Sequence, residues 1–242
     1  MTHAQFRPVL AAAALVLAAV TAPALGAQSA PRAQAPAGDR LAGAAIDRAA
    51  RAVRNARTVR AAFEQTLSNP ATGNTNVATG ELTLGRPNKM AVRFNNPAGD
   101  RVVIDGTNLW VYLPAAFPGQ VLKQPARGGA GQSIDALGDL LANPRSRYRV
   151  ADAGAATVGG RATRAVLLTP RTEGSPLERA KVWVDDRDGA IRQLELTEAT
   201  GGVRTWRMTT WEPNARLAAD AFTFMVPPGV RVVDRIAMAG GQ

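Results

Sequence analysis

The sequence contains no cysteine, and its only histidine is His3. The lack of cysteine excludes disulfides, thiolate metal sites, cysteine nucleophiles and the lipid-bearing cysteine of a bacterial lipoprotein. His3 lies in an N-terminal segment that we expect to be removed, so the mature chain would hold no histidine. Serine–histidine catalysis and histidine-ligated zinc are then excluded as well. We therefore expect a protein that is not an enzyme and that uses neither a metal nor another cofactor.

Long hydrophobic runs are also scarce, and the one that exists lies at the N-terminus. Arg7 precedes an apolar run from Val9 to Val20, and the helix-breaking Pro23 and small residues follow through Ala27. This pattern predicts a secretory signal peptide over residues 1–27. The run is too short for a membrane span, which needs about 20 residues. We therefore predict an exported protein that is not itself lipidated.

Acidic residues are too few to balance the basic ones. The chain has 29 Lys and Arg against 19 Asp and Glu, and its net charge of +10 falls to +9 when Arg7 is removed with the signal peptide. Such a charge suits nucleic acid or an anionic membrane surface. Most of the arginines are scattered singly, however, and export argues against nucleic acid as a partner. We interpret the charge as a solvated surface with at most a weak attraction to anionic lipid headgroups.

The rest of the chain suits a single domain over residues 39–242. Before it, residues 28–38 are rich in Ala, Pro and Gln and predict a disordered N-terminal tail. Asp39 is a suitable N-cap for an amphipathic helix over residues 39–55, where apolar residues recur at three- and four-residue spacing. From Thr58 the spacing changes to two, which predicts that a strand follows the helix directly.

Short strand-like segments separated by turn residues fill most of the domain, and their regular spacing predicts an antiparallel meander. Asp105-Gly106 and Asp188-Gly189 are strong signals for tight hairpins. About eleven strands against two helices predict a mainly β protein. The strand that begins at Thr58 is followed by predicted strands at 77–85, 89–95, 101–105, 109–113, 120–123, 148–151, 162–169, 180–185, 190–198 and 203–211.

A second helix is predicted over residues 133–142, between two strands. Ser133 is a good N-cap, and Asn143-Pro144 ends the pattern. One face of this helix is apolar, which suits a helical lid over the strands. The apolar stripe consists of Ile134, Leu137, Leu140 and Leu141.

Residues 80–121 contain turn and aromatic motifs in a characteristic order. A glycine-led strand runs into Arg-Pro, a strand with alternating large residues ends at a proline, and a further strand runs into Asp-Gly before an aromatic pair. These motifs are Gly80, Arg86-Pro87, Pro97, Asp105-Gly106, Trp110 and Tyr112.

This stretch resembles the outer-membrane lipoprotein carrier family, LolA-like. Phe63-Glu64-Gln65 is similar to the family's first-strand Phe-x-Gln, and Ala221-Phe222-Thr223-Phe224, followed by Pro228-Gly229-Val230, is similar to its C-terminal signature. The chain departs from the family at Met90 and Val92, where aromatic residues are more usual.

The resemblance implies an incomplete, half-open antiparallel β-barrel that helices close around a hydrophobic cavity. It implies a monomeric periplasmic chaperone that takes the acyl chains of lipoproteins from an inner-membrane ABC-type release complex and passes them to an outer-membrane acceptor. It also implies that Arg86, which matches the arginine of the family's Arg-Pro motif, bonds backbone carbonyls of the lid and keeps the empty cavity shut.

Strand alternation and the lid helix supply the candidate cavity residues. Met90, Val92 and Phe94 alternate on one face of a strand, and we assign residues of the next two strands to the same interior. A carrier needs a large apolar surface and no polar catalyst, since each buried methylene contributes about 0.8 kcal/mol. The predicted lining consists of Met90, Val92, Phe94, Val103, Leu109, Val111, Ile134, Leu137, Leu140 and Leu141.

Each assignment has a plainer alternative. The apolar residues would equally form a solid barrel core, the helix at 133–142 a permanent plug, and Arg86 a solvated turn residue. A carrier or sensor of another amphiphile, such as a glycolipid or isoprenoid, would use the same barrel, and a lipid hydrolase or isomerase is the enzymatic alternative. The acidic run Asp185–Gly189 lacks the ligand pattern of a calcium loop and favours a hairpin turn. Gly128–Gly131 lacks a Walker lysine and favours a hinge.

Overall fold

The computed structural model describes residues 36–126 and 140–234 of the chain. The predicted signal peptide, most of the predicted tail and the predicted lid residues Ile134 and Leu137 lie outside the described residues. Within the described part, no helix is both long enough and apolar enough to cross a membrane.

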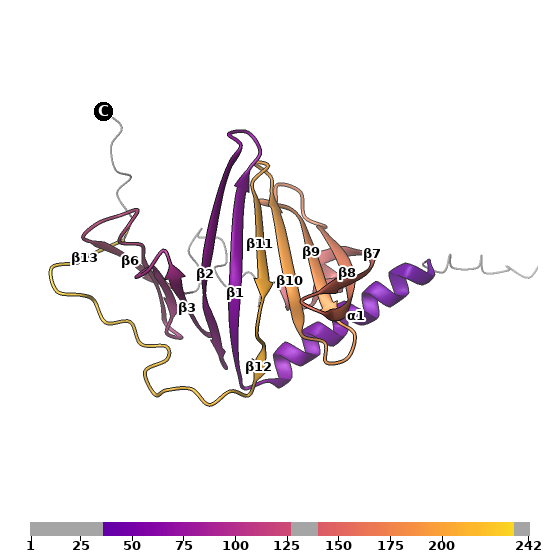
Figure 1. Ribbon diagram of the computed structural model, residues 1–242, viewed down its shortest axis with the longest axis horizontal. Helices are drawn as coiled ribbons and strands as arrows, with labels where there is room; N and C mark the ends of the chain where they lie inside the picture. The colour runs from indigo at the N-terminus through magenta and orange to yellow at the C-terminus, as the bar shows by residue number, and fades with distance from the viewer. Residues whose placement is uncertain (1–35, 127–139, 235–242) are drawn as a thin grey trace, which may run out of the picture. The chain divides into compact units, whose positions relative to one another are not determined.

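A single sheet dominates the described part of the chain (Figure 1). Its strand order is β13-β6-β5-β4-β3-β2-β1-β11-β10-β9-β8-β7, with β12 added beside β1. All neighbouring strands are antiparallel except β13 and β6, which are parallel. The strands are β1 Thr58–Asn69, β2 Asn74–Gly85, β3 Lys89–Asn96, β4 Arg101–Ile104, β5 Asn108–Tyr112, β6 Gln120–Pro125, β7 Tyr148–Val158, β8 Arg161–Pro170, β9 Leu177–Asp185, β10 Ile191–Glu198, β11 Val203–Met208, β12 Glu212–Pro213 and β13 Arg231–Val233.

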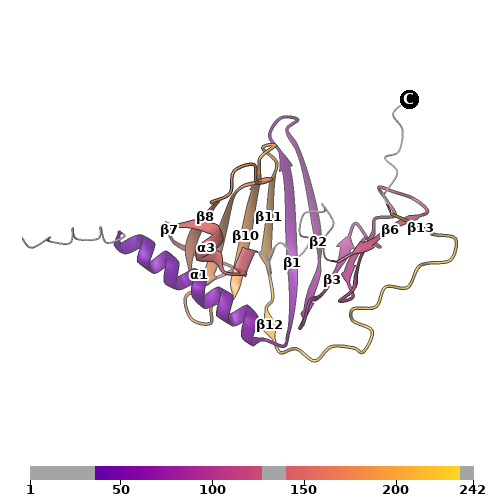
Figure 2. The ribbon, with the colours of Figure 1, turned by 180° about the vertical axis from the view of Figure 1, so that it is seen from behind.

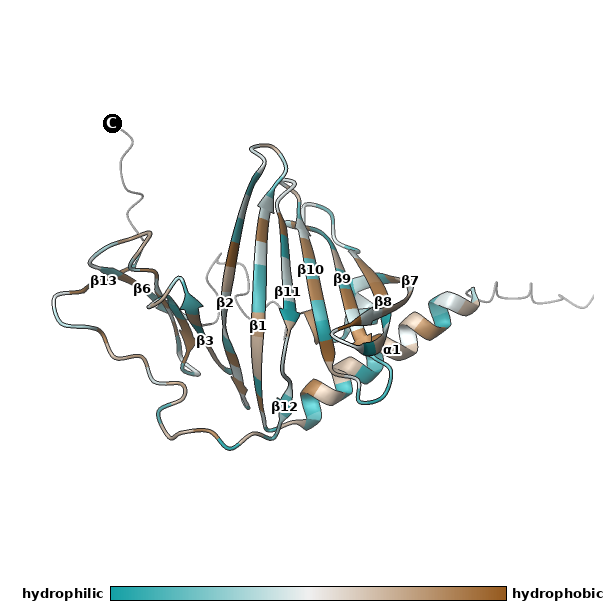
Figure 3. Cartoon of the chain, in the orientation of Figure 1, coloured by the Kyte–Doolittle hydropathy of each residue, from teal (hydrophilic) through white to brown (hydrophobic). Residues whose placement is uncertain are grey.

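The sheet is open, because its two end strands, β13 and β7, do not pair with each other. The prediction of a mainly β, antiparallel and unclosed architecture is therefore confirmed. Closure of this sheet by a lid around a cavity stays a prediction. Hydrophobic and hydrophilic residues alternate along the strands (Figure 3), as expected where one face of a sheet is buried and the other is more exposed.

Helix α1, Ala37–Asn55, packs against β7, β8 and β9 at one end of the sheet (Figure 2). Its buried face is built mostly from small residues, which allow the helix to lie close to the strands. Ala45, Ile46 and Ala49 on this face are at most 1% exposed. A short helix, α3 at Pro144–Arg147, leads into β7. The buried residues of α1 are Ala42, Gly43, Ala45, Ile46, Ala49, Ala50 and Val53.

The predicted N-cap of α1 is wrong. The helix begins at Ala37 rather than 39, and the residue at its N-cap position is Pro36. Asp39 lies in the first turn, where its carboxylate accepts a hydrogen bond of 2.9 Å from the backbone N–H of Asp152 in β7. Asp39 therefore joins the helix to the end strand of the sheet instead of capping its own helix.

The C-terminal residues add an element that was not predicted from the sequence. We call residues 214–230 the C-terminal strap; they run from β12, beside β1, to β13, beside β6 (Figure 1). Arg93 donates a 3.3 Å hydrogen bond to the Ala221 carbonyl, and the ring of Phe224 stacks on Trp110 with centroids 5.3 Å apart. The strap therefore lies on the face of the sheet that carries Arg93 and Trp110.

Asp105 fixes the position of the Trp110 ring. Its carboxylate accepts hydrogen bonds from the Thr107 and Asn108 N–H groups, at 2.8 and 2.7 Å, and from the Trp110 indole N–H at 2.9 Å. Burial alone would raise the pKa of Asp105, but these hydrogen bonds outweigh it and lower the pKa. The predicted Asp-Gly hairpin thus also positions the aromatic platform on which the strap packs.

The acidic run Asp185–Gly189 forms the turn between β9 and β10. Asp185 is fully buried and accepts hydrogen bonds from Arg161 Nε at 2.7 Å and Arg192 Nε at 2.9 Å. Burial alone would raise its pKa, but the two guanidinium groups and the Arg187 N–H hold the pKa well below the usual range. Among the described residues, no group of three potential ligands is placed to hold a metal ion.

We expect Gly85→Ala to destabilise the protein by about 1–3 kcal/mol. A Cβ at Gly85 would lie 2.5 Å from the Phe222 ring, so the strap would have to shift. Urea denaturation measures the change, with Gly202→Ala as the control because its Cβ would meet only an ordinary contact at 3.4 Å. In a Phe222→Leu background, Gly85→Ala should lower the free energy of unfolding by less. An unchanged loss would show that contact with the strap does not cause the destabilisation.

We expect stability to fall as the pH drops below about 5, in part because of Asp185. Its pKa is lower in the folded than in the unfolded chain, so acid drives protonation of the unfolded state first. Asp185→Asn should cost roughly 2 kcal/mol at pH 7 and flatten the decline between about pH 5 and 2. Denaturation midpoints across this range test it, with Asp186→Asn as the exposed control from the same turn. If the denaturation midpoints of Asp185→Asn and wild type fell in parallel with pH, Asp185 would not be a source of the acid sensitivity.

Candidate functional site: the inner face and its rim

We define the inner face as the side of the sheet that carries Phe63, Met90 and Val182. Side chains of directly paired residues point to the same side of a sheet, so the strand register extends this face from β5 to β7. Leu84 pairs with Met90, and Met90 pairs with Ile104. The apolar side chains gathered on it include Phe63, Leu82, Leu84, Met90, Val92, Phe94, Val102, Ile104, Val150, Val166, Leu168, Val182, Leu194, Leu196, Trp206 and Met208.

Three of the predicted residues lie together on this face. Met90 is buried, whereas Val92 and Phe94 are half-buried and pack against the core. The Phe94 ring meets Phe63 edge to face, with centroids 5.6 Å apart. Gly80 pairs with both Phe63 and Phe94. A Cβ at Gly80 would lie 2.4 Å from the Arg93 carbonyl oxygen and 2.9 Å from the Phe63 ring, so the glycine allows the close approach of β3 as well as the aromatic contact.

Val103 does not belong to this set. It pairs with Ala91 on β3 and with Trp110 on β5, so its side chain points to the opposite, outer face. Its neighbours Val102 and Ile104 occupy the inner face instead and pack against the core. The prediction was therefore wrong at Val103. Neighbouring residues of a strand point to opposite faces, so an error of one residue in assigning a strand reverses the face of all its side chains.

Leu109 and Val111 lie on the inner face, as their pairing with Ile104 and Val102 requires. Both are buried. Of the predicted lid residues, Leu140 and Leu141 are helical, 2% and 3% exposed, and part of the main core. The register therefore places most of the predicted lining that the structure describes on one face.

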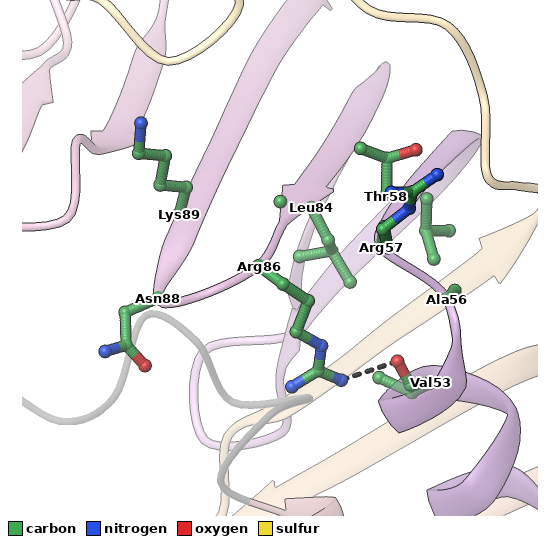
Figure 4. Close-up of a pocket in the computed structure, with 10 residues that line it drawn as sticks. Val53, Ala56, Arg57, Thr58, Leu84, Arg86, Asn88 and Lys89 are labelled. Carbon is green, nitrogen blue, oxygen red and sulfur yellow. Dashed lines mark hydrogen bonds between the residues drawn. The ribbon is translucent and has the colours of Figure 1, made fainter.

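Arg86 lies in the turn that joins β2 to β3. Its Nη2 donates a 2.5 Å hydrogen bond to the backbone carbonyl of Val53, in the last turn of α1 (Figure 4). The last four carbonyls of a helix have no partner within the helix, so this carbonyl is free to accept. The resemblance implied a bond from Arg86 to lid carbonyls. Within the described residues, its partner is the end of α1.

A small pocket lies beside this bond, at the rim of the inner face. Its volume of about 60 Å³ admits a few water molecules, so it is a feature of the rim rather than a chamber for acyl chains. Three of its lining residues are cations, namely Arg57, Arg86 and Lys89. No sequence signal marked this group, because Arg57 is separated from the other two by the whole β1–β2 hairpin. The remaining lining residues are Val53, Ala56, Thr58, Val59, Leu84, Gly85 and Asn88.

The sequence model of the family described as outer membrane lipoprotein carrier protein LolA matches residues 54–225. The chain belongs to the LolA family. This LolA-family match begins at the last turn of α1 and ends in the C-terminal strap, so it includes Arg86 and most of the inner face.

Two relatives named outer-membrane lipoprotein carrier protein show how far the likeness to LolA proteins extends. The one from Methylibium petroleiphilum is 28% identical over 188 residues, which cover 78% of this chain and 88% of the relative. The one from Dechloromonas aromatica is also 28% identical over 188 residues, covering 78% and 86%.

The fold is also similar to a solved structure. An uncharacterized conserved protein from Thermus thermophilus superposes with a TM-score of 0.52 at 12% identity, covering 80% of this chain and 98% of that one. At this identity the likeness concerns the fold alone.

Proposed function

We propose that this protein is a periplasmic chaperone that holds the acyl chains of lipoproteins against its inner face. It carries them from an inner-membrane ABC-type release complex to an outer-membrane acceptor. The observation that supports the proposal most is the continuous apolar inner face of an open sheet, in a chain of the LolA family. In this proposal the protein is exported by the signal peptide at residues 1–27, acts as a monomer and catalyses no reaction.

The inner face suits acyl chains because part of it is already accessible. Val92, Phe94 and Ile104 are only half-buried, so a bound chain would cover surface that now faces solvent. Each methylene that leaves water contributes about 0.8 kcal/mol, and no directional bond is needed. Met90 lies beside them and is unbranched and polarizable, which suits a surface that must adapt to different chains.

The bond between Arg86 and Val53 is the proposed latch. It ties the β2–β3 turn at the rim to the end of α1. A hydrogen bond that involves a charged group contributes about 1.5–3 kcal/mol, which the burial of a few methylenes offsets. In the proposal the helix at 133–142 covers the empty inner face, and cargo displaces this helix and opens the latch. The acceptor must then offer a more favourable apolar surface, since the carrier has to release its cargo.

The first test is extraction of cargo from a membrane. Inner-membrane vesicles that hold labelled triacylated lipoprotein and its release complex are incubated with the purified protein, and soluble one-to-one complex is measured. We expect such a complex to form. Mass spectrometry of lipid that copurifies with the protein identifies the alternative cargo: a glycolipid or isoprenoid in place of lipoprotein would keep the carrier but change its cargo.

We expect Val92→Asp to reduce the yield of this complex about tenfold or more, because it places a charge among the acyl chains. Val77→Asp is the matched control, since Val77 is 59% exposed on β2 and outside the inner-face set. Thermal melting checks that both variants fold. Equal loss in the two variants, or none in Val92→Asp, would remove the inner face from cargo binding.

We expect Arg86→Leu to retain cargo and to accumulate the loaded form, because the latch no longer favours the empty state. Transfer of labelled lipoprotein from the loaded protein to outer-membrane acceptor measures this. Arg101→Leu, an exposed arginine on β4, is the control and should release cargo at the wild-type rate. Wild-type release from Arg86→Leu would exclude Arg86 from the mechanism.

A further inference from the structure

Cations gather where α1 ends. Arg54 lies in the last turn of the helix, Arg57 follows two residues after its end, and Arg86 and Lys89 come from the facing β2–β3 turn. We call these four residues the rim cluster. Three of them line the rim pocket, which has no carboxylate among its ten lining residues (Figure 4).

Other arginines of the same two elements are paired with carboxylates. Arg48 of α1 pairs with Asp186 at 3.6 Å, and Arg60 of β1 pairs with Glu212 at 2.7 Å. By contrast, the exposed side chains of Arg54 and Arg57 make no hydrogen bond or ion pair with any residue in the described ranges. The rim cluster is therefore a local excess of positive charge on a surface whose arginines are otherwise often paired.

The end of α1 explains only part of this excess. Cations near a helix C-terminus interact favourably with its dipole, which accounts for Arg54 and for the bond from Arg86 to Val53. Arg57 and Lys89 lie outside the helix, and its dipole does not require them. Lys89 approaches the Phe222 ring only to 6.0 Å from the centroid, at the limit of a cation–π contact.

We infer that the rim cluster docks on the surface of a bilayer that contains anionic phospholipid. The headgroup phosphates of such a lipid complement four cations that have no carboxylate partner among the described residues. Each cation near an anionic surface strengthens binding roughly fivefold, and salt weakens the attraction. Docking by this cluster is therefore reversible, and it places the rim of the inner face next to the membrane. This inference goes beyond the proposed function, because it requires neither lipoprotein nor release complex.

Vesicle cosedimentation tests the docking surface with lipid alone. The purified exported protein is mixed with vesicles of phosphatidylcholine, or of phosphatidylcholine with about 30% phosphatidylglycerol, at low salt and at about 0.5 M salt. We expect binding to the anionic vesicles at low salt only. The double substitution Arg54→Gln with Arg57→Gln should weaken this binding about 25-fold.

Two further variants make the result specific. Arg101→Gln with Arg231→Gln removes the same charge from exposed residues of β4 and β13 and should weaken binding far less. Arg54→Lys with Arg57→Lys keeps the charge and should bind as wild type does. Equal binding to both kinds of vesicle, or equal loss in the two Gln variants, would overturn the inference. Cargo extraction measured on the same proteins separates this failure from a failure of the carrier function.

Discussion

The strand register is the constraint on which the rest of this structure depends. Side chains alternate across a strand. The inner face is therefore continuous only if the apolar residues of every two neighbouring strands are paired so that they point to the same side of the sheet. Long hairpins maintain this pairing: in β1–β2 it runs without interruption from Thr58 with Gly85 to Asn69 with Asn74. The register also shifts at several points, and at one of them, between Thr79 and Gly80, the glycine takes the position paired with Phe63 and Phe94.

An open sheet leaves two edges, and exposed edges tend to pair with other chains. The two edge strands of this sheet differ in their contacts and in their length. At β7 the Asp39 carboxylate of α1 accepts the N–H of Asp152, and α3 packs against the same strand. At the other end, the last strand is only Arg231–Val233. A short strand offers little template for pairing, so the sheet can stay open for function at a limited risk of aggregation.

Turn chemistry explains why so much of the fold could be predicted from the sequence. Proline, glycine and Asp-Gly pairs mark the ends of most strands, and α1 has clear helical spacing. The strands that were missed have no such signal: β12 and β13 are too short to show alternation, and their pairing depends on partners distant in the sequence. Asp39 had the right residue type for an N-cap, but tertiary contact with Asp152 decided its role.

For the candidate inner face, alternation in the sequence predicted the side on which some residues lie, but not all. Met90, Val92 and Phe94 share one face as predicted, because their alternation lies within a single strand. Val103 was misplaced because the pairing of β4 with β3 decides which of its residues face inward. The four residues of β4 do not reveal this pairing on their own. The β4 segment Arg-Val-Val-Ile has apolar residues on both sides, so its pattern alone does not distinguish the two faces.

The position of Arg86 connects the latch with the basic surface. An arginine in a β-turn is ordinarily solvated, but here α1 ends within its reach and presents a carbonyl that has no partner inside the helix. The same geometry brings Arg54 and Arg57 to the rim, because the chain must leave α1 there to enter β1. The bond between Arg86 and Val53 and the cations of the rim cluster thus share one structural cause, the direct connection between the helix and the first strand. A change of charge at this corner would therefore act on the end of α1 and on the rim of the inner face together.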